Sequence, residues 1–170
     1  NLRAILEYAE RYYEPSEAFR PRLVDGVRLS ADEKALLNKL QQATAILQFK
    51  LESQLIERRP DFQLEHRDLL HFIDFSQNKI ELAGETYDLI DFQAPTINPE
   101  QPASLTEEEE KIIAHLLNNF KTSDKLKRHV GFLQEKGAMY LSYNGNLLIH
   151  GCLPLHENGD FKSFTIDKKA

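Results

Sequence analysis

A long amphipathic segment between Ser30 and Pro60 constrains the fold of this chain more than any other stretch. The sequence Ser30-Ala-Asp-Glu33 is a capping box, in which the serine oxygen accepts the Glu33 amide and the Glu33 side chain returns to the Ser30 amide. The pattern predicts a helix that runs to about Arg58 and buries two faces. The apolar residues at or beside helical spacing are Leu36, Leu37, Leu40, Ala43, Ile46, Leu47, Phe49, Leu51, Leu55 and Ile56.

Three shorter helices are predicted from the same signals. Residues 1–13 repeat apolar side chains at helical spacing until Pro15 ends the pattern. Thr106-Glu-Glu-Glu109 is a second capping box, and we expect the acidic run 107–110 to form a solvated first turn. The buried stripe predicted for the helix that follows it is Ile112, Ile113, Leu116, Leu117 and Phe120.

The last of these helices begins at Ser123, which is placed to cap it, and ends at Gly137. Its inward positions are predicted to be Leu126, Val130 and Leu133.

Strand patterns occur at two places in the chain. Residues 79–89 alternate polar and apolar side chains around Ala83-Gly-Glu85 and predict a small hairpin. Residues 138–143 and 146–150 flank Asn144-Gly145, a strong short hairpin signal because both residues accept a positive φ. Residues 161–166 alternate and predict a further strand after a turn at 157–160.

The predicted fold class is therefore α+β and mainly α. Residues 1–136 form a mainly helical segment with a hairpin near 79–89, and residues 137–170 form a β-rich piece. Residues 91–105 carry three prolines and are expected to be a connecting loop.

Composition excludes several classes of protein. The net charge of −6 argues against a nucleic-acid partner, because nucleic-acid binders are normally basic. The single cysteine, Cys152, permits no internal disulfide, and no apolar stretch has the length of a membrane span. A cytoplasmic location is expected. The chain starts inside a helical pattern and its only methionine is Met139, so we expect a piece of a longer protein.

The residue of greatest chemical interest is His150. The apolar run 147–149 delivers it at the end of a strand, and Gly151 lets the backbone turn away, which is a common way to present a metal ligand. A packed, hydrogen-bonded histidine is the alternative. No second metal-binding motif lies nearby, and a metal site needs three or more ligands, so its co-ligands are expected elsewhere.

Other charged residues have plainer interpretations. Arg58 and Arg59 suit the carboxyl end of the long helix, where cations interact favourably with the dipole. The alternative is a pair that binds a phosphate of a substrate. His66 and His71 stand five residues apart, which does not place both on one helical face, and we expect both at the surface or at its boundary with the core.

The segment Leu147-Leu-Ile-His150-Gly-Cys-Leu-Pro154 resembles the strand–His–Gly–Gly–Leu–Ser–Pro element of calcineurin-like metallophosphatases. The longer stretch 132–155 resembles the class III fructose-1,6-bisphosphatases of Firmicutes and some Bacteroidetes. Further agreement lies at Ala45–Glu52, Arg58-Arg-Pro60, Leu105–Glu110 and Phe161–Ser163, so the resemblance covers nearly the whole chain.

The resemblance implies a manganese-dependent hydrolysis of fructose 1,6-bisphosphate to fructose 6-phosphate in gluconeogenesis. It implies a dinuclear metal centre in which His150 is one ligand. The other ligands would lie outside this chain, so the chain would be inactive alone. Residues 1–136 would be a helical insertion, and 137–170 part of the sandwich core of the catalytic domain. Cys152 replaces the second glycine of the element and is expected to be a small packing residue.

Two alternatives stay open from the sequence. The helical part could be a regulatory or oligomerisation module, in which the two-faced helices pack on a partner and give a homo-oligomer. A weaker alternative is an independent domain that binds a small molecule and is unrelated to phosphatases.

Overall fold

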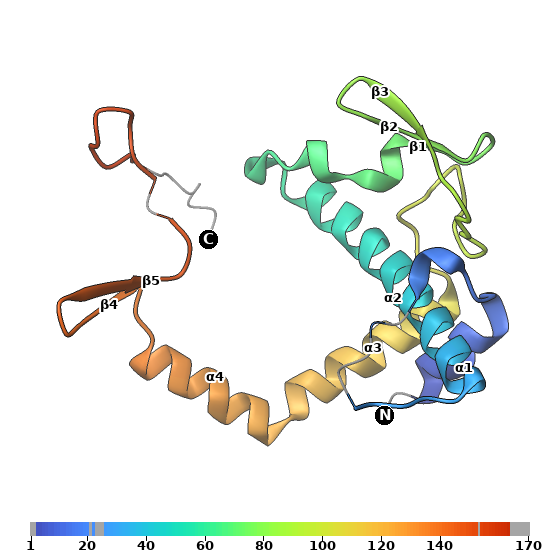
Figure 1. Ribbon diagram of the computed structural model, residues 1–170, viewed down its shortest axis with the longest axis horizontal. Helices are drawn as coiled ribbons and strands as arrows, with labels where there is room; N and C mark the ends of the chain where they lie inside the picture. Colours follow the sequence, from blue (N-terminus) through green and yellow to red (C-terminus); the bar gives the residue numbers. More distant parts are fainter. Residues whose placement is uncertain (1–2, 21, 23–25, 153, 164–170) are drawn as a thin grey trace. The chain divides into compact units, whose positions relative to one another are not determined.

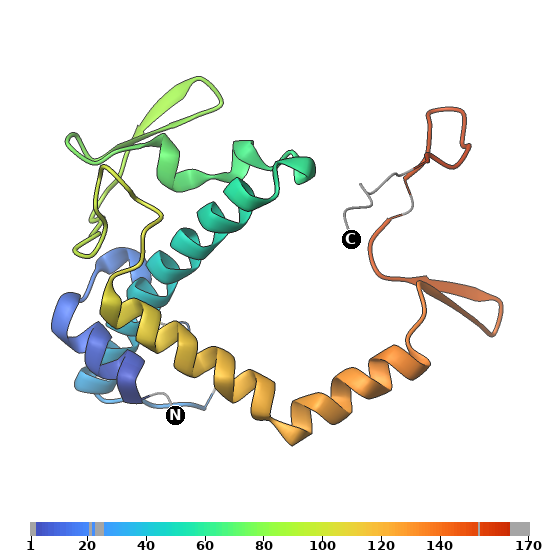
Figure 2. The same cartoon turned by 180° about the vertical axis from the view of Figure 1, so that it is seen from behind.

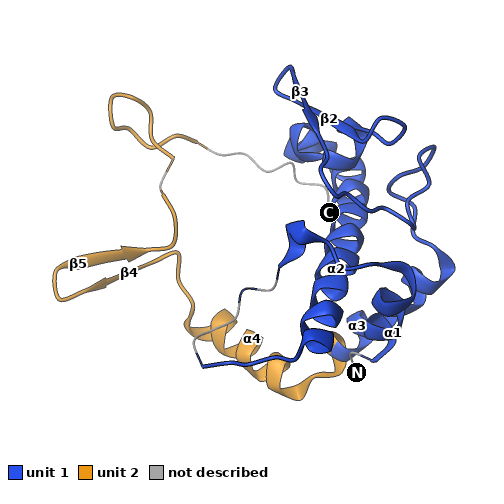
Figure 3. Ribbon diagram, turned by 45° about the vertical axis from the view of Figure 1, so that its right-hand side comes forward, with its two compact units in different colours: residues 1–119 blue, residues 120–170 orange. Residues whose placement is uncertain are grey.

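The chain folds into two compact units, Asn1–Asn119 and Phe120–Ala170 (Figure 3). The computed structural model describes residues 3–20, 22, 26–152 and 154–163. The predicted division at residue 136 stays a prediction. In the part of the chain that the structure describes, no helix is both long and apolar enough to cross a membrane.

Unit 1 is built on the long predicted helix, α2, which spans Ala31–Arg58. The Ser30 capping box is confirmed: the Glu33 amide donates to Ser30 Oγ at 3.2 Å, and the Ser30 amide donates to Glu33 Oε2 at 2.8 Å. A cap of this kind contributes about 1 kcal/mol to helix stability. The first predicted helix is α1, Arg3–Tyr12, and it packs against α2 (Figure 1).

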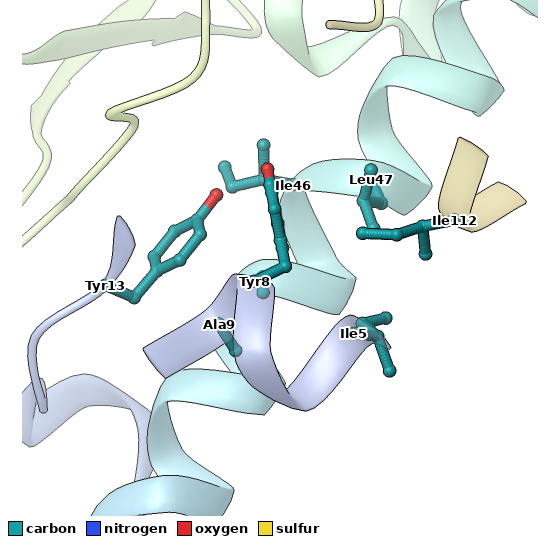
Figure 4. Packing of buried hydrophobic residues seen from close by; sticks show 8 residues of the cluster. Ile5, Tyr8, Ala9, Tyr13, Ile46, Leu47 and Ile112 are labelled. Atoms are coloured by element: carbon teal, nitrogen blue, oxygen red, sulfur yellow. The ribbon is translucent and has the colours of Figure 1, made fainter. Parts of the chain in front are cut away.

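The hydrophobic core of unit 1 lies between α1, α2 and α3, the last of which spans Glu107–Thr122 (Figure 2). Tyr8 and Tyr13 are fully buried and approach each other with ring centroids 6.2 Å apart. Figure 4 shows the cluster from close by. Its buried members are Ile5, Tyr8, Ala9, Tyr13, Ala43, Ile46, Leu47 and Ile112.

The buried face of α2 differs from the predicted leucine stripe, because it is partly polar. Asn38 Nδ2 donates to the carbonyl of Ser16 at 2.7 Å, and Gln42 Nε2 donates to the carbonyl of Glu14 at 2.7 Å. Buried backbone groups need partners, and after α1 the chain has only one 3₁₀ turn, Glu17–Phe19, to supply them. Polar side chains on α2 therefore satisfy this segment, while Leu55 stays 44% exposed.

A buried ion pair joins α2 to α3. Lys50 Nζ lies 2.8 Å from Glu109 Oε2, and both side chains are completely buried. Tyr8 Oη donates to Glu109 Oε1 at 2.6 Å, and Lys50 also donates to the carbonyl of Thr96 at 2.7 Å. The expectation that residues 107–110 are all solvated is therefore wrong for Glu109.

The same glutamate also closes the second predicted capping box. The Thr106 amide donates to Glu109 Oε2 at 2.7 Å, and the Glu109 amide donates to Thr106 Oγ1 at 3.2 Å. Glu109 thus completes the first turn of α3 and holds three segments together, so one side chain determines where α3 begins and what it packs on.

The predicted hairpin near 79–89 is confirmed as β2, Lys79–Leu82, and β3, Glu85–Asp88. Ala83 and Gly84 have φ of 53° and 83°, as a two-residue hairpin turn requires. Ile73–Asp74 adds strand β1, which gives an antiparallel sheet in the order β1-β2-β3. The segment before it forms three short 3₁₀ turns, Pro60–Phe62, Glu65–Arg67 and Leu69–Phe72.

Unit 2 contains α4, Asp124–Lys136, and a hairpin of β4, Tyr140–Tyr143, and β5, Asn146–Ile149. Ser123 caps α4 as predicted, because its Oγ accepts the Leu126 amide at 3.3 Å. The Asn144-Gly145 turn is also confirmed, with φ of 50° and 71°.

None of the described residues of unit 2 is buried. The inward positions predicted for α4 are wrong in this respect, since Val130 is 44% and Leu133 is 64% exposed. The predicted strand 161–166 is reduced to an isolated bridge between Leu155 and Phe161 at its first residue, and residues 164–166 lie outside the described part. In α3 likewise, Leu117 and Phe120 are exposed where burial was predicted.

We predict that Lys50→Met lowers the free energy of unfolding by about 3–5 kcal/mol, because it leaves the Glu109 carboxylate buried without its cation. The double variant Lys50→Met/Glu109→Gln recovers most of this loss, since no charge is then buried. Urea unfolding of the chain followed by circular dichroism measures both. Glu110→Gln, on the exposed side of the same turn, is the control and changes stability by less than about 0.5 kcal/mol. A Lys50→Met loss no larger than the control would contradict the prediction.

The Glu109 pair also predicts a pH dependence. Burial raises the pKa of the Glu109 carboxyl, but hydrogen bonds from Lys50, Tyr8 and the Thr106 amide outweigh it, so the net pKa is below the ordinary value of 4.5. A lowered pKa stabilises the fold fully above the unfolded-state value, and this contribution is lost as the pH falls below it. The melting-temperature gap between wild type and Glu109→Gln should therefore be constant near neutral pH and shrink in acid. A gap that widens on acidification would exclude this assignment.

Candidate functional site

The predicted metal ligand, His150, directly follows strand β5. Pairing of Tyr140 with Ile149 and of Leu141 with Leu148 fixes the end of the strand, and hence the position of the next Cα atom. Gly151 has a φ of 96°, a conformation that residues with a Cβ rarely adopt, so the chain turns away after the histidine. The structure therefore confirms the strand–histidine–turn arrangement that the sequence predicts.

A shallow apolar concavity of about 260 Å³ adjoins His150. Its walls come from the two strands and from the turn after them. His150 is the one histidine among the lining residues. Apolar walls around one polar group are typical of sites that orient a ligand with few contacts. The lining residues are Met139, Tyr140, Leu147, Ile149, His150, Gly151 and Cys152.

His150 is exposed, and none of residues 120–152 and 154–163 forms a hydrogen bond or an ion pair with its imidazole. No group of three His, Cys, Asp or Glu side chains that could hold a metal ion occurs among the described residues. A metal centre with fewer than three protein ligands is unusual. The described residues therefore provide one donor, His150, for a metal at this position, and further ligands would have to come from elsewhere. Cys152 is exposed and unpaired in unit 2.

The two arginines at the end of α2 differ in their surroundings. Arg59 donates to Asp61 through Nε at 2.8 Å and through Nη2 at 2.6 Å, and its guanidinium lies 3.9 Å from the centre of the Phe62 ring. This fork-like pairing raises the pKa of Arg59 further and occupies two of its donors. Arg58 is exposed in the last turn of α2.

A histidine constellation in unit 1 is absent from the sequence-based predictions. His71 Nδ1 lies 2.8 Å from Asp68 Oδ2, and its Nε2 lies 3.7 Å from Glu57 Oε1. The buried Ser53 hydroxyl donates to the other oxygen of Asp68. A carboxylate on one ring nitrogen fixes the orientation of an imidazole, as it does for many metal-binding and catalytic histidines.

His71 also lines a cavity of about 370 Å³ between α2 and the loop before α3. Glu57 and Glu100 give its lining a negative charge, and Ala103 is held there by the Gln54 side chain, which donates to its carbonyl at 2.7 Å. The spacing Asp68-x-x-His71 was the one sequence signal for this contact. An aspartate three residues before a histidine in an irregular segment is too common to predict that the two side chains meet. His66 is exposed, as predicted.

Comparison with known proteins gives a match along the entire chain. A sequence family described as Firmicute fructose-1,6-bisphosphatase matches residues 1–170. A class 3 fructose-1,6-bisphosphatase of Lactococcus lactis subsp. cremoris MG1363 is 99% identical over 170 residues, which are 100% of this chain and 27% of that protein. The protein of the same name from Lactococcus lactis subsp. lactis IL1403 is 85% identical over the same shares.

More distant relatives show the same coverage. A class 3 fructose-1,6-bisphosphatase of Streptococcus agalactiae is 50% identical over 171 residues, which are 100% of this chain and 26% of that protein. The chain thus spans about a quarter of the length of the curated relatives it matches. No solved structure matches it. From the family match over its whole length, the chain belongs to the Firmicute fructose-1,6-bisphosphatase family.

Proposed function

We propose that this chain is a segment of an enzyme that hydrolyses fructose 1,6-bisphosphate to fructose 6-phosphate and phosphate, in gluconeogenesis and in the cytoplasm. The observation that carries the proposal is the family match over residues 1–170, together with relatives named for this activity at 99% to 50% identity. The proposed substrate is one partner of the chain. Because the chain covers only about a quarter of those relatives, the rest of its own polypeptide is the other. The isolated chain is inactive.

In this proposal, the β4–β5 hairpin is part of the sandwich core of a metallophosphatase domain. Cross-strand pairing puts Tyr140 and Ile149 on one face of the hairpin and Leu141 and Leu148 on the other. All four are more than a third exposed. A strand with apolar side chains on both faces is typical of a sheet that is covered on both sides. The hairpin is therefore suited to the interior of a larger layered domain.

His150 would be one ligand of a dinuclear manganese centre whose other ligands belong to the rest of the polypeptide. When bound, such a centre would neutralise phosphate charge and lower the pKa of a bound water. The contribution of the chain is to present one imidazole at a strand end, beside an apolar concavity. The turn at Gly151 supports this role, as does an imidazole without a partner among the described residues of unit 2.

Arg58 and Arg59 are proposed to contact a phosphate of the substrate. Arg58 is the better candidate of the two, because Asp61 already accepts two hydrogen bonds from Arg59. The alternative function, a helical regulatory or oligomerisation module, is compatible with the proposal if the helical unit controls the enzyme.

We predict that His150→Ala in the full-length enzyme lowers both the bound manganese and the hydrolysis of fructose 1,6-bisphosphate. Loss of one imidazole ligand should reduce metal affinity by at least the tenfold to hundredfold typical of losing an outer-shell partner. Metal content by mass spectrometry and phosphate release with added manganese measure the two effects. His156→Ala, an exposed histidine six residues further along, is the matched control. Unchanged metal content and activity in His150→Ala would remove the ligand role.

For the arginines, Arg58→Ala should raise KM for fructose 1,6-bisphosphate with little change in kcat, as expected for a contact made equally in ground and transition states. Steady-state kinetics of the full-length enzyme measures both constants. Lys39→Ala, a half-buried cation on the same helix that pairs with Glu14, serves as the control. Kinetics equal to the control would argue for the helix-dipole interpretation.

A further inference from the structure

Unit 1 carries an apolar groove that none of its own described segments fills. The groove encloses about 340 Å³ and lies between α1, α2 and α3. Its floor is the edge of the hydrophobic core, where Ile5 and Leu47 are buried (Figure 4). The lining residues are Ile5, Thr44, Leu47, Gln48, Leu51, Glu52, Leu55, Ile113 and Leu116.

The walls of the groove are aliphatic and its rim is polar. Leu51, Ile113 and Leu116 are half-buried, and Leu55 is 44% exposed. Gln48 and Glu52 are exposed along one side, where Gln48 donates to Glu52 at 2.9 Å, so the rim is polar. The lining of the groove contains leucine and isoleucine but no tryptophan, tyrosine or arginine. Those three residues are enriched at the centre of reversible binding surfaces, so the lining is closer in composition to the interior of a domain. The groove has the composition of a core that lacks one of its sides.

The size of the groove selects among possible occupants. A stable complex between two separate proteins needs roughly 1,000 Å² of buried surface and about 20–30 residues on each side. Nine residues line this groove, which is too few to hold a second copy of the chain by this face alone. A segment of the same polypeptide is held nearby at an effective concentration of about millimolar, so a small apolar contact is sufficient.

We infer that the groove is the seat of an apolar segment from the remaining part of the same polypeptide. About three quarters of the length of the relatives lies outside this chain, which provides the occupant. The segment would be an amphipathic helix or strand that inserts two or three aliphatic side chains between Leu51, Leu55 and Leu116. The groove thereby attaches the helical unit to the rest of the protein. This inference depends on the family placement and not on the reaction proposed above.

Cysteine labelling of the full-length protein tests the inference. Leu55→Cys is placed in the groove, and Gln41→Cys is an exposed control on the same helix outside the groove. A maleimide reagent is used, and peptide mass spectrometry separates each site from Cys152 and other cysteines. We expect Leu55→Cys to react at least about tenfold more slowly than Gln41→Cys in the native protein, as for a site covered about nine-tenths of the time. The two sites should react at equal rates in denaturant.

Repeating the labelling over a hundredfold range of protein concentration identifies the occupant. Protection that does not change on dilution, and that is absent when residues 1–170 are labelled alone, supports a segment from the rest of the polypeptide. Protection in residues 1–170 alone means that unit 2 of this chain covers the groove, and it overturns the inference. Protection that disappears on dilution means that a second copy fills the groove, and reaction at the control rate means that nothing does; both overturn the inference. Thr44→Cys, on the rim, is a second probe if Leu55→Cys alters the circular dichroism spectrum. If the unsubstituted full-length protein shows no phosphatase activity while Leu55→Cys is protected as expected, the proposed function fails and this inference stands.

Discussion

The interaction on which unit 1 depends is the buried pair of Lys50 and Glu109. The Coulomb attraction between two buried charges is large, but so is the cost of removing both from water. Here the cost is offset because the carboxylate also accepts from Tyr8 Oη and from the Thr106 amide, and the ammonium also donates to the Thr96 carbonyl. Each partner comes from a different segment. The pair thus selects one arrangement of α1, α2, the loop 91–105 and α3, which an apolar contact of similar size could not specify as sharply.

Much of unit 1 was predictable because its signals are local. Both capping boxes, the Ala83-Gly84 turn and the end of α2 before Pro60 depend on residues within four positions of one another. The buried role of Glu109 was not predictable, because a glutamate three residues after a threonine at a helix start has the same pattern whether it is solvated or paired. Its partner, Lys50, is 59 residues away and sits among leucines as an ordinary helix-forming cation. Asn38 and Gln42 were missed for the same reason: their partners are backbone groups of another segment.

Unit 2 shows the opposite relation between sequence and structure. Its local elements follow the sequence closely, with a Ser123 cap and an Asn144-Gly145 turn, yet no described residue in it is buried. Two strands and one helix of this length are too few to enclose a core, and an isolated hairpin is at best marginally stable in water. Burial predicted from a hydrophobic stripe presupposes a neighbour. For Val130, Leu133 and the hairpin side chains, that neighbour is not among the described residues of unit 2. Leu55 and Leu116, which line the groove in unit 1, likewise lack a neighbour on one side among the described residues of that unit.

This dependence bears directly on His150. A metal ligand must be held to within a fraction of an ångström, and sites on rigid elements achieve this better than sites on loops. The β5 strand fixes the Cα position of His150 only as firmly as the hairpin itself is fixed, and the hairpin has no core of its own. If His150 is a ligand, its imidazole must be held in place partly by whatever part of the protein packs on Leu141, Leu148 and Ile149. That packing then matters for the position of the imidazole as much as the backbone of His150 does. Metal binding and packing of the hairpin would then be thermodynamically coupled, because a preformed site rarely exists before the chain around it folds. Aliphatic residues in β4 and β5 should therefore matter for metal affinity although none of them can bind a metal.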